Sequence, residues 1–483
     1  MVGMNKLKKF LDDDDNSVAK AAVYYLICQL MVKGISFITT PIFTRLLTKG
    51  EYGEVSNFFA WQAMLLPLVT LDLRVTINKS RYDYEKENDS YLASILLTSN
   101  IITLLVLLII ELNQAFFVDV FSMSMFYIRI MFLYIIFQTA FDYQQIQYNI
   151  FHKYKRYVFY TVLSTVASVL LAVGLVLLVE NRMAGRILGA VIPAVIVDAI
   201  IYISILKRAK KLRFEYVRYA VLMAVPLIPS ALSSTILSTS DRAMITNMCG
   251  GEQTALYSVA YSVSAIAGIL WTALNQAWSP WLYDKFKAEK FNEVKRFSNK
   301  FSLLYAVLII GIMLIAPEIV LVMGGKAYMS TIAVMPPVIL AMVCQFFYAF
   351  YFNTEYFYGE TYIISIGTAI AAALNLGLNY LLIPKYGYIA AAYTTLAGYA
   401  AMYLYHYLIV KYRMKKAFIF DNKFLAAIVV VLCGIQFLIS LVYEIYVARY
   451  AIIVVYSVAL LVLAVKNKEI IMGFVRKFIK KRG

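Results

Sequence analysis

Long apolar stretches recur along the whole chain, and short polar segments separate them. Fourteen stretches between residues 20 and 465 have about the 20 residues that a helix needs to cross the hydrocarbon layer of a membrane. The pattern therefore predicts an all-α integral membrane protein with about 14 transmembrane helices.

Polar segments of similar character divide the apolar stretches of the two halves. Near the N-terminus, one stretch ends in Thr44-Arg45, and Glu51-Tyr52-Gly53 leads into the next. In the second half, Ser240-Asp241-Arg242 lies between the helices expected at 217–240 and 254–280. We therefore expect a hinge between two helices at each of these places.

The two halves also share landmarks at one offset. Ser56 and Ser258 lie 202 residues apart, and so do Gly185 and Gly387. Self-similarity at half the chain length is typical of transporters built from two repeated helix bundles. The alternative is chance similarity between apolar segments of low diversity.

A repeat of this length predicts two six-helix lobes followed by an extra helix pair. The predicted parts are an N-terminal lobe, a cytoplasmic linker between the lobes, a C-terminal lobe, and the helix pair with a basic tail: 1–206, 207–218, 219–410 and 411–483.

Composition agrees with a membrane protein. Hydrophobic residues make up 62% of the chain and charged residues 15%, which leaves too little polar surface for a soluble exterior. Basic residues resist translocation, and 35 of the 45 Lys and Arg fall on loops of one side when the N-terminus is cytoplasmic. Both termini are therefore predicted to be cytoplasmic, although the inner segment 355–361 carries Glu355 and Glu360 and no basic residue.

The sequence gives no support for nucleic acid binding, metal binding or catalysis. The net charge of +17 follows from topology and attraction to anionic lipids, so no nucleic acid partner is expected. Four cysteines without paired spacing and two histidines predict no disulfide frame, metal site or catalytic group. Without a G-x-x-x-x-G-K-[ST] phosphate loop, ATP hydrolysis is not expected either. The chain is therefore not predicted to be an enzyme or to hold a cofactor.

Five basic residues are candidate ligands for an anionic substrate. Lys33 and Arg129 lie within spans, where a buried charge costs at least about 2.5 kcal/mol, so each should face a polar interior or a partner group. Arg45 and Arg242 recur at the two hinges, and guanidinium groups suit phosphate oxygens. A helix cap formed by the neighbouring acid is the alternative for Arg242. Arg74 follows at the inner end of the second helix.

Four acidic residues are candidates for ion coupling or gating. Asp72 lies beside the inner end of the second helix, Asp142 in the fourth, Asp198 at the centre of the sixth, and Asp241 at the second hinge. A carboxylate within a membrane is a functional candidate, with coupling to H⁺ or Na⁺ as the specific hypothesis. A structural hydrogen bond is the alternative.

Two helices have unusual features. In the fourth helix, Gln138 and Gln145 share a face, whereas Arg129 lies on the opposite face at 100° per residue. In the seventh, Pro226 and Pro229 remove backbone donors, which membranes tolerate where a cavity is lined. We expect the seventh helix to bend there.

Five short motifs resemble those of the polysaccharide-transport flippases, within the multidrug/oligosaccharidyl-lipid/polysaccharide exporter superfamily. The nearest members are the Wzx-type flippases of O-antigen and capsule repeat units. The motifs lie at residues 43–53, 240–242, 255–258, 275–280 and 382–389.

The resemblance implies a V-shaped pair of six-helix lobes that flips undecaprenyl-diphosphate-linked oligosaccharide across the bacterial plasma membrane by alternating access. It also implies a basic central cavity, for which Lys33, Arg45, Arg129 and Arg242 are candidates, with Arg74 at its inner mouth. Lys33 and Arg129 lie in none of the motifs. Energy is expected from an ion gradient or from consumption of the product outside. The expected partners are the lipid-linked substrate, membrane lipids and polysaccharide polymerase machinery.

Other functions remain open. A lipid II flippase or a multidrug exporter would share the superfamily, although multidrug exporters usually have twelve helices. A membrane glycosyltransferase or polymerase would need a large outer loop with catalytic acids, and the outer loops here are short and carry few acids.

Overall fold

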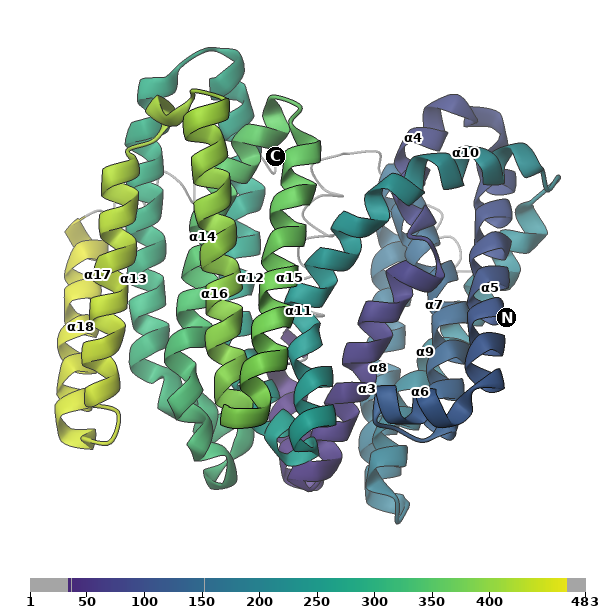
Figure 1. Cartoon of the computed structure of the whole chain (residues 1–483), viewed down its shortest axis with the longest axis horizontal. Helices are drawn as coiled ribbons and strands as arrows, with labels where there is room; N and C mark the ends of the chain where they lie inside the picture. Colours follow the sequence, from purple (N-terminus) through teal and green to yellow (C-terminus); the bar gives the residue numbers. More distant parts are fainter. Residues whose placement is uncertain (1–33, 36, 152, 467–483) are drawn as a thin grey trace, which may run out of the picture.

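The structure, a computed structural model, describes residues 34–35, 37–151 and 153–466 (Figure 1). Within these residues the regular elements are helices, without strands. Ten helices are long and apolar enough to cross a membrane, and an eleventh is added if one bent pair counts as a single span. The predicted all-α membrane fold is confirmed. The count of fourteen stays a prediction, because most of the first expected helix lies outside the described residues.

After the helical residues 37–46, the described part of the N-terminal lobe contains seven further α-helices and two 3-10 turns. In chain order they are α3 (Lys49–Val69), η1 (Leu73–Thr76), α4 (Ile77–Asp83), η2 (Glu85–Glu87), α5 (Asn88–Leu112), α6 (Gln114–Phe121), α7 (Met125–Ile150), α8 (Tyr154–Leu178) and α9 (Arg182–Arg208). A connecting segment follows, with α10 (Phe214–Ala224) and η3 (Val225–Leu227).

The C-terminal lobe begins with a helix that faces α3 of the first lobe. Its elements and the final pair are α11 (Ile228–Cys249), α12 (Gly251–Lys287), α13 (Phe291–Gly324), η4 (Lys326–Val334), α14 (Met335–Phe357), α15 (Thr361–Tyr386), α16 (Tyr388–Leu408), α17 (Asn422–Leu441) and α18 (Tyr446–Lys466). Short π and 3-10 segments, η5 (Ile409–Arg413) and η6 (Ala417–Ile419), precede α17.

The two lobes are built alike. Helix α3 begins at Lys49 and α12 begins at Gly251, which is the same offset of 202 residues as the landmarks in the sequence. In the first lobe α7 and α8 pack on α9, and in the second α14 and α15 pack on α16. The final pair extends the second lobe, since α17 packs on α13 and α14 and α18 packs on α13.

Contact between the lobes is concentrated at one end of the molecule. Figure 1 shows α3 converging on α11 at the end where α11 joins α12, and α3 packs against both α11 and α12. We call this the outer end. We call the opposite end, which carries α4, α10 and the loop between α12 and α13, the inner end, because its basic loops are predicted to be cytoplasmic.

Glycines allow the two lobes to touch backbone to backbone at the outer end. A Cβ atom added at Gly53 would lie only 1.7 Å from the carbonyl oxygen of Gly251, and one added at Gly251 would lie 2.7 Å from that of Gly50. No side chain larger than hydrogen fits at Gly53 without moving the helices. The N-terminal turns of α3 and α12 therefore form a tight crossing between the lobes.

Polar contacts surround this crossing. Thr44 Oγ1 donates to the carbonyl of Met323 at 2.5 Å. Asn247 Nδ2 donates to Ser122 Oγ at 3.0 Å and to the carbonyl of Asp119 at 3.1 Å. These hydrogen bonds join the two lobes, so the structure has a closed outer end.

The connecting helix α10 belongs by its contacts to the first lobe. It packs against α5 and η1, and the ring of Tyr84 contacts the rings of Tyr216 and Tyr219 at 4.9 and 5.4 Å. Arg213 adds an ion pair with Glu87 at 3.2 Å. Between α10 and α11 the helix tightens into the 3-10 segment η3, which contains Pro226, and residues 214–249 together form one span. The predicted bend of the seventh helix stays a prediction.

The expected hinge at Ser240-Asp241-Arg242 was wrong. These residues lie inside α11, which continues to Cys249, and the break comes at Gly250, whose φ of +87° favours glycine. Glu51-Tyr52-Gly53 likewise lies inside α3. Polar residues can remain in a membrane helix when neighbouring helices satisfy them, and Asp241 is satisfied in this way.

Candidate functional site

Two arginines, one from each lobe, lie beside Tyr52 of α3 near the closed outer end. Arg242 of α11 and Arg186 of α9 are both close enough to the Tyr52 hydroxyl to interact with it electrostatically. Both side chains are half-buried. The structure thus brings predicted Arg242 together with a second guanidinium that was not predicted.

Aromatic rings hold both guanidinium groups in place. Arg242 lies over the ring of Tyr261 at 4.5 Å, and Arg186 lies over that of Phe43 at 4.0 Å. Neither guanidinium makes a hydrogen bond or an ion pair within the described residues. Cation–π contact fixes a guanidinium through its face and leaves its N–H groups at the edge. These edges are available to an anionic ligand.

Arg186 escaped prediction because it lies in the first turns of α9. Basic residues commonly flank membrane spans, so a position at the start of a span did not mark Arg186 as a candidate. A signal was nevertheless present, since Gly185 and Gly189 bring α9 against α8: a Cβ at Gly189 would lie 2.2 Å from the Cα of Ala172. Close packing of this kind places the neighbouring Arg186 inside the bundle.

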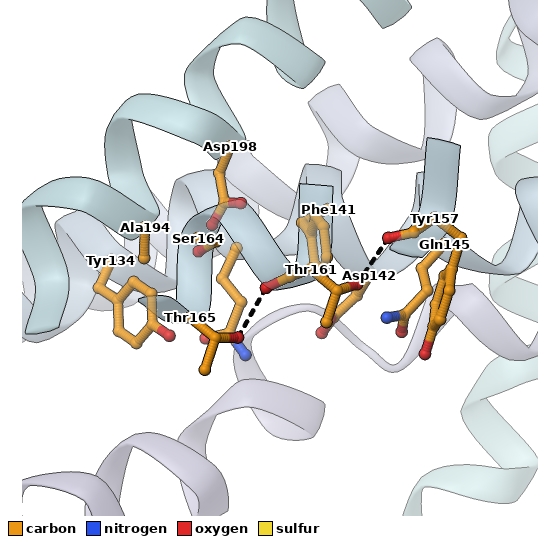
Figure 2. Close-up of a pocket in the computed structure, with 11 residues that line it drawn as sticks. Tyr134, Phe141, Asp142, Gln145, Tyr157, Thr161, Ser164, Thr165, Ala194 and Asp198 are labelled. Carbon is orange, nitrogen blue, oxygen red and sulfur yellow. Dashed lines mark hydrogen bonds between the residues drawn. The ribbon is translucent and has the colours of Figure 1, made fainter. Parts of the chain in front are cut away.

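A second polar feature is a cavity of about 310 Å³ within the N-terminal lobe, between α7, α8 and α9. Figure 2 shows carboxylate, amide and hydroxyl side chains from the three helices around it. Its lining residues are Tyr134, Gln138, Phe141, Asp142, Gln145, Tyr157, Thr161, Ser164, Thr165, Ala194 and Asp198. Gln138 and Gln145 both line it, which confirms the face that the sequence predicted for them.

The two carboxylates of this cavity have unused acceptor capacity. Asp198 is 3% exposed, and neither it nor Asp142 accepts a hydrogen bond from any residue that the structure describes. The hydroxyls of Thr161 and Thr165 are already turned to their own helix, donating to the carbonyls of Tyr157 and Thr161 at 2.8 and 2.6 Å. Carboxylates in such a setting are suited to accept hydrogen bonds from a ligand.

Asp72 and Arg74 adjoin the cavity on its inner side. The Arg74 Nε donates to Asp72 Oδ1 at 2.5 Å, and the guanidinium also interacts electrostatically with Asp142. Asp72 is buried and has a positive φ of 43°, where the chain turns after α3. Arg74 remains 43% exposed by side chain, so it can still meet a ligand.

Asp241 is the most completely coordinated acid in the second lobe. It is 1% exposed and accepts hydrogen bonds from Asn379 Nδ2 and Thr395 Oγ1, each at 2.6 Å, and from the Tyr257 hydroxyl. Asn379 in turn accepts from Thr394 and donates to Asn375. The alternative that Asp241 and Arg242 cap a helix end does not apply, because both lie within α11.

The remaining predicted residues make their contacts elsewhere. Arg129 is 55% exposed and pairs with Glu111 through two hydrogen bonds of 2.7 and 2.9 Å. Arg45 is exposed and donates to the carbonyl of Pro41 at 2.7 Å. Lys33 lies outside the described residues. Among the described residues, no group of three or more His, Cys, Asp or Glu side chains is arranged to hold a metal ion.

Comparison with known proteins identifies the family. A model of a family described as polysaccharide biosynthesis protein matches residues 18–286, more than half of the chain. The chain belongs to this polysaccharide biosynthesis protein family. The matched region contains α3, α11, α12 and all of the polar features described above except the residues of α15 and α16.

Two proteins of Haemophilus influenzae are similar to this chain in sequence. One is named Lsg locus putative protein 1 and is 25% identical over 384 residues, covering 75% of this chain and 92% of the relative. The other is named an uncharacterized membrane protein and is 24% identical over 377 residues, covering 75% and 89%.

Solved structures show the same fold. A lipid II flippase MurJ in an inward closed conformation superposes with a TM-score of 0.63 at 15% identity, covering 90% of this chain and all of that one. An inward-facing multidrug resistance MATE transporter of the MOP superfamily gives 0.54 at 13% identity, covering 82% and 95%. The predicted polysaccharide family and the predicted fold are therefore confirmed, and the protein is a multi-pass membrane protein.

Proposed function

We propose that this protein flips undecaprenyl-diphosphate-linked oligosaccharide repeat units across the bacterial plasma membrane, for a polysaccharide of the O-antigen or capsule type. Both termini are cytoplasmic in this proposal, and the inner end faces the cytoplasm. The observation that carries the proposal is the meeting of Arg186 and Arg242 beside Tyr52, one from each lobe and neither of them paired with another described residue.

A diphosphate is the group that fits these two arginines. Guanidinium groups bind phosphate oxygens through parallel hydrogen bonds, and two of them supply two positive charges in a site partly withdrawn from water. A diphosphate cannot cross hydrocarbon without such neutralisation, because an unpaired charge in a membrane costs several kcal/mol. The prenyl chain can stay in the surrounding lipid.

The cavity between α7, α8 and α9 suits a sugar of the same substrate. Its volume of about 310 Å³ lies at the lower end of the range for small-molecule sites, so it holds part of an oligosaccharide rather than all of it. Asp142 and Asp198 offer free acceptors to sugar hydroxyls, and Gln138 and Gln145 offer both donors and acceptors.

Because one arginine lies on each lobe, affinity for the diphosphate depends on the conformation of the protein. When the outer end opens, α9 and α11 move with different lobes, so Arg186 and Arg242 separate and each phosphate loses one of its two cations. Affinity for the diphosphate then falls on the side where the substrate is released. A site divided between lobes thus supports alternating access without any bond being made or broken, and the protein needs no catalytic group.

Energy comes from an ion gradient or from consumption of the product by polysaccharide polymerase machinery outside. Asp241 is the proposed coupling group for H⁺ or Na⁺, because its buried carboxylate, now held by the Asn379 amide N–H and the Thr395 hydroxyl, could bind a proton or a hard cation when these donors turn away. Asp72, Asp142 and Asp198 are proposed to act in the first lobe, where Asp72 and Arg74 form a pair that can open at the inner side.

The test is complementation of a deletion strain with single variants at matched expression. Arg186→Ala and Arg242→Ala should each lower surface polymer and cause lipid-linked repeat units to accumulate on the inner leaflet. Arg182→Ala is the matched control, since Arg182 lies one turn earlier on α9 and is exposed. Its one hydrogen bond to a described residue goes to the carbonyl of Leu46 at 3.1 Å. Normal export in both Arg186→Ala and Arg242→Ala would remove the arginines from the substrate path.

The same strain separates the rival substrates. Loss of surface polymer with normal growth and normal peptidoglycan supports the oligosaccharide, whereas a growth defect with accumulated lipid II supports lipid II. Asp198→Asn keeps the size of the side chain and replaces one acceptor oxygen with an N–H₂ donor. It should weaken export by about 5- to 150-fold at limiting substrate, since a buried polar group left without its hydrogen bond costs roughly 1–3 kcal/mol.

A further inference from the structure

A carboxylate and an imidazole are buried together in the C-terminal lobe, away from the sites described above. Glu355 lies in the last turn of α14 and His406 in the last turn of α16, both at the inner end. Their side chains are 0% exposed, and His406 Nδ1 lies 2.6 Å from Glu355 Oε2. Histidine is the residue whose ordinary titration falls near neutral pH.

The pair is enclosed rather than solvated. Gly367 of α15 faces it, and a Cβ there would lie 2.9 Å from His406 Nε2. The rings of Tyr348 and Tyr405 lie 5.5 and 5.3 Å from the imidazole ring. Glu355 Oε1 and His406 Nε2 are buried and have no hydrogen-bond partner among the residues that the structure describes. Each member of the pair therefore depends on the other for its polar contact.

Within the described part of the chain, the Glu355–His406 pair has no permanent counter-ion. Glu360, in the turn after α14, interacts electrostatically with Glu355, but it also pairs with Arg413 of η5 at 3.5 Å. That ion pair is partly exposed, with Arg413 at 62% by side chain. With one proton shared between Glu355 and His406 the buried unit is neutral. Without that proton a buried negative charge remains, which a membrane-embedded core disfavours strongly.

A chain of tyrosines connects this pair to the lobe junction. Tyr348 contacts His406, and its hydroxyl is near enough to that of Tyr399 to interact electrostatically. Tyr399 shares a hydroxyl hydrogen bond with Tyr261 of α12. The ring of Tyr261 carries the guanidinium of Arg242. A change in packing around Glu355 and His406 can therefore be transmitted to Arg242 through adjacent side chains.

We propose that Glu355 and His406 form a proton-binding site that stabilises the conformation with a closed outer end. The protonated pair is compatible with full burial, as the structure shows it. Loss of the proton favours the alternative conformation, in which the pair gains a partner or water. The proposal does not depend on which substrate is carried, because it concerns the balance between conformations of the substrate-free protein.

The test measures outer-end opening against pH in the purified full chain. The four native cysteines are replaced by serine, and spin labels are placed at Glu180→Cys and Lys385→Cys, which are exposed at the outer ends of the two lobes. Electron–electron distance measurements in lipid nanodiscs between roughly pH 5.5 and 8.5 then report the open and closed populations. As pH rises, the closed population should fall, by at most about ten-fold per pH unit for one proton.

Glu355→Gln is the decisive variant, because it keeps the shape and the hydrogen-bonding atoms but cannot ionise. Its open-to-closed ratio should vary by less than two-fold over a range in which the parent varies by ten-fold or more. His406→Gln, which removes the imidazole from the pair, should flatten the response independently. Normal gel-filtration profiles show that each variant is folded. A parent-like pH response in both folded variants, or no pH response in the parent, would overturn the proposal.

Discussion

The contact of Gly53 with Gly251 predicts the effect of a single methyl group on conformation. Gly53→Ala should shift the protein away from the state with a closed outer end. In that state the new Cβ would lie 1.7 Å from the carbonyl oxygen of Gly251 and 2.8 Å from its Cα. Both neighbours are backbone atoms, so no side chain can rotate to make room.

The size of the effect follows from this geometry. Carbon and oxygen atoms need a separation above about 3 Å, so α3 and α12 must move apart by roughly 1.5 Å at their crossing. Forcing an extra carbon into a well-packed contact costs about 1–3 kcal/mol. The clash exists only while the lobes touch, so this free energy acts on the conformational equilibrium, which should shift about 5- to 150-fold toward outer opening.

The spin-label pair at positions 180 and 385 measures this shift directly. Gly50→Ala is the matched control, since Gly50 lies on the same helix, and a Cβ there meets nothing within 4 Å. It should keep the parent distance distribution, whereas Gly53→Ala should move to longer distances. If the two variants show the same closed population, the glycine crossing does not hold the lobes together, and the reasoning from backbone contact is refuted.

Two further predictions concern buried charges of the second lobe. Asn379→Ala removes a 2.6 Å hydrogen bond to Asp241 and should lower the free energy of unfolding by about 1.5–3 kcal/mol, measured by thermal denaturation in detergent. Asn375→Ala, next to it on α15 and without a bond to Asp241, should cost less. Glu318→Ala leaves Arg449, which is 1% exposed, without its ion-pair partner. It should cost about 2–3 kcal/mol and increase proteolysis between α17 and α18, since a buried charge without a partner is strongly destabilising.

The membrane fold could be predicted largely from the lengths of the apolar stretches in the sequence. Among the fourteen apolar stretches of the sequence, residues 91–111 correspond to α5 (Asn88–Leu112) and residues 447–465 to α18 (Tyr446–Lys466). A membrane span is encoded by its own residues, because it satisfies its backbone internally and faces lipid along much of its surface. The offset of 202 residues between the two halves could also be predicted, because it relates two segments of the sequence directly.

The cationic site was only partly predictable, because the cost of burying a charge depends on what surrounds it. Arg129 looked like a lone charge within a span, yet it pairs with Glu111, a partner 18 residues away on another helix. Arg186 looked like a flanking residue, yet close packing of α8 and α9 brings it inside. Sequence shows which residues are expensive to bury, whereas the tertiary structure decides which of them are paired and which remain free.

The error at Ser240-Asp241-Arg242 has a physical explanation with consequences for mechanism. Adjacent residues on a helix point about 100° apart, so Asp241 can face α15 and α16 while Arg242 faces the lobe junction. The polar motif is therefore two separate contacts on one rigid helix rather than a flexible joint. A change in the ligands of Asp241, by a proton or a cation, would rotate or shift α11 as a unit. Such a movement displaces Arg242, so the buried acid can influence the substrate-facing guanidinium without touching the substrate.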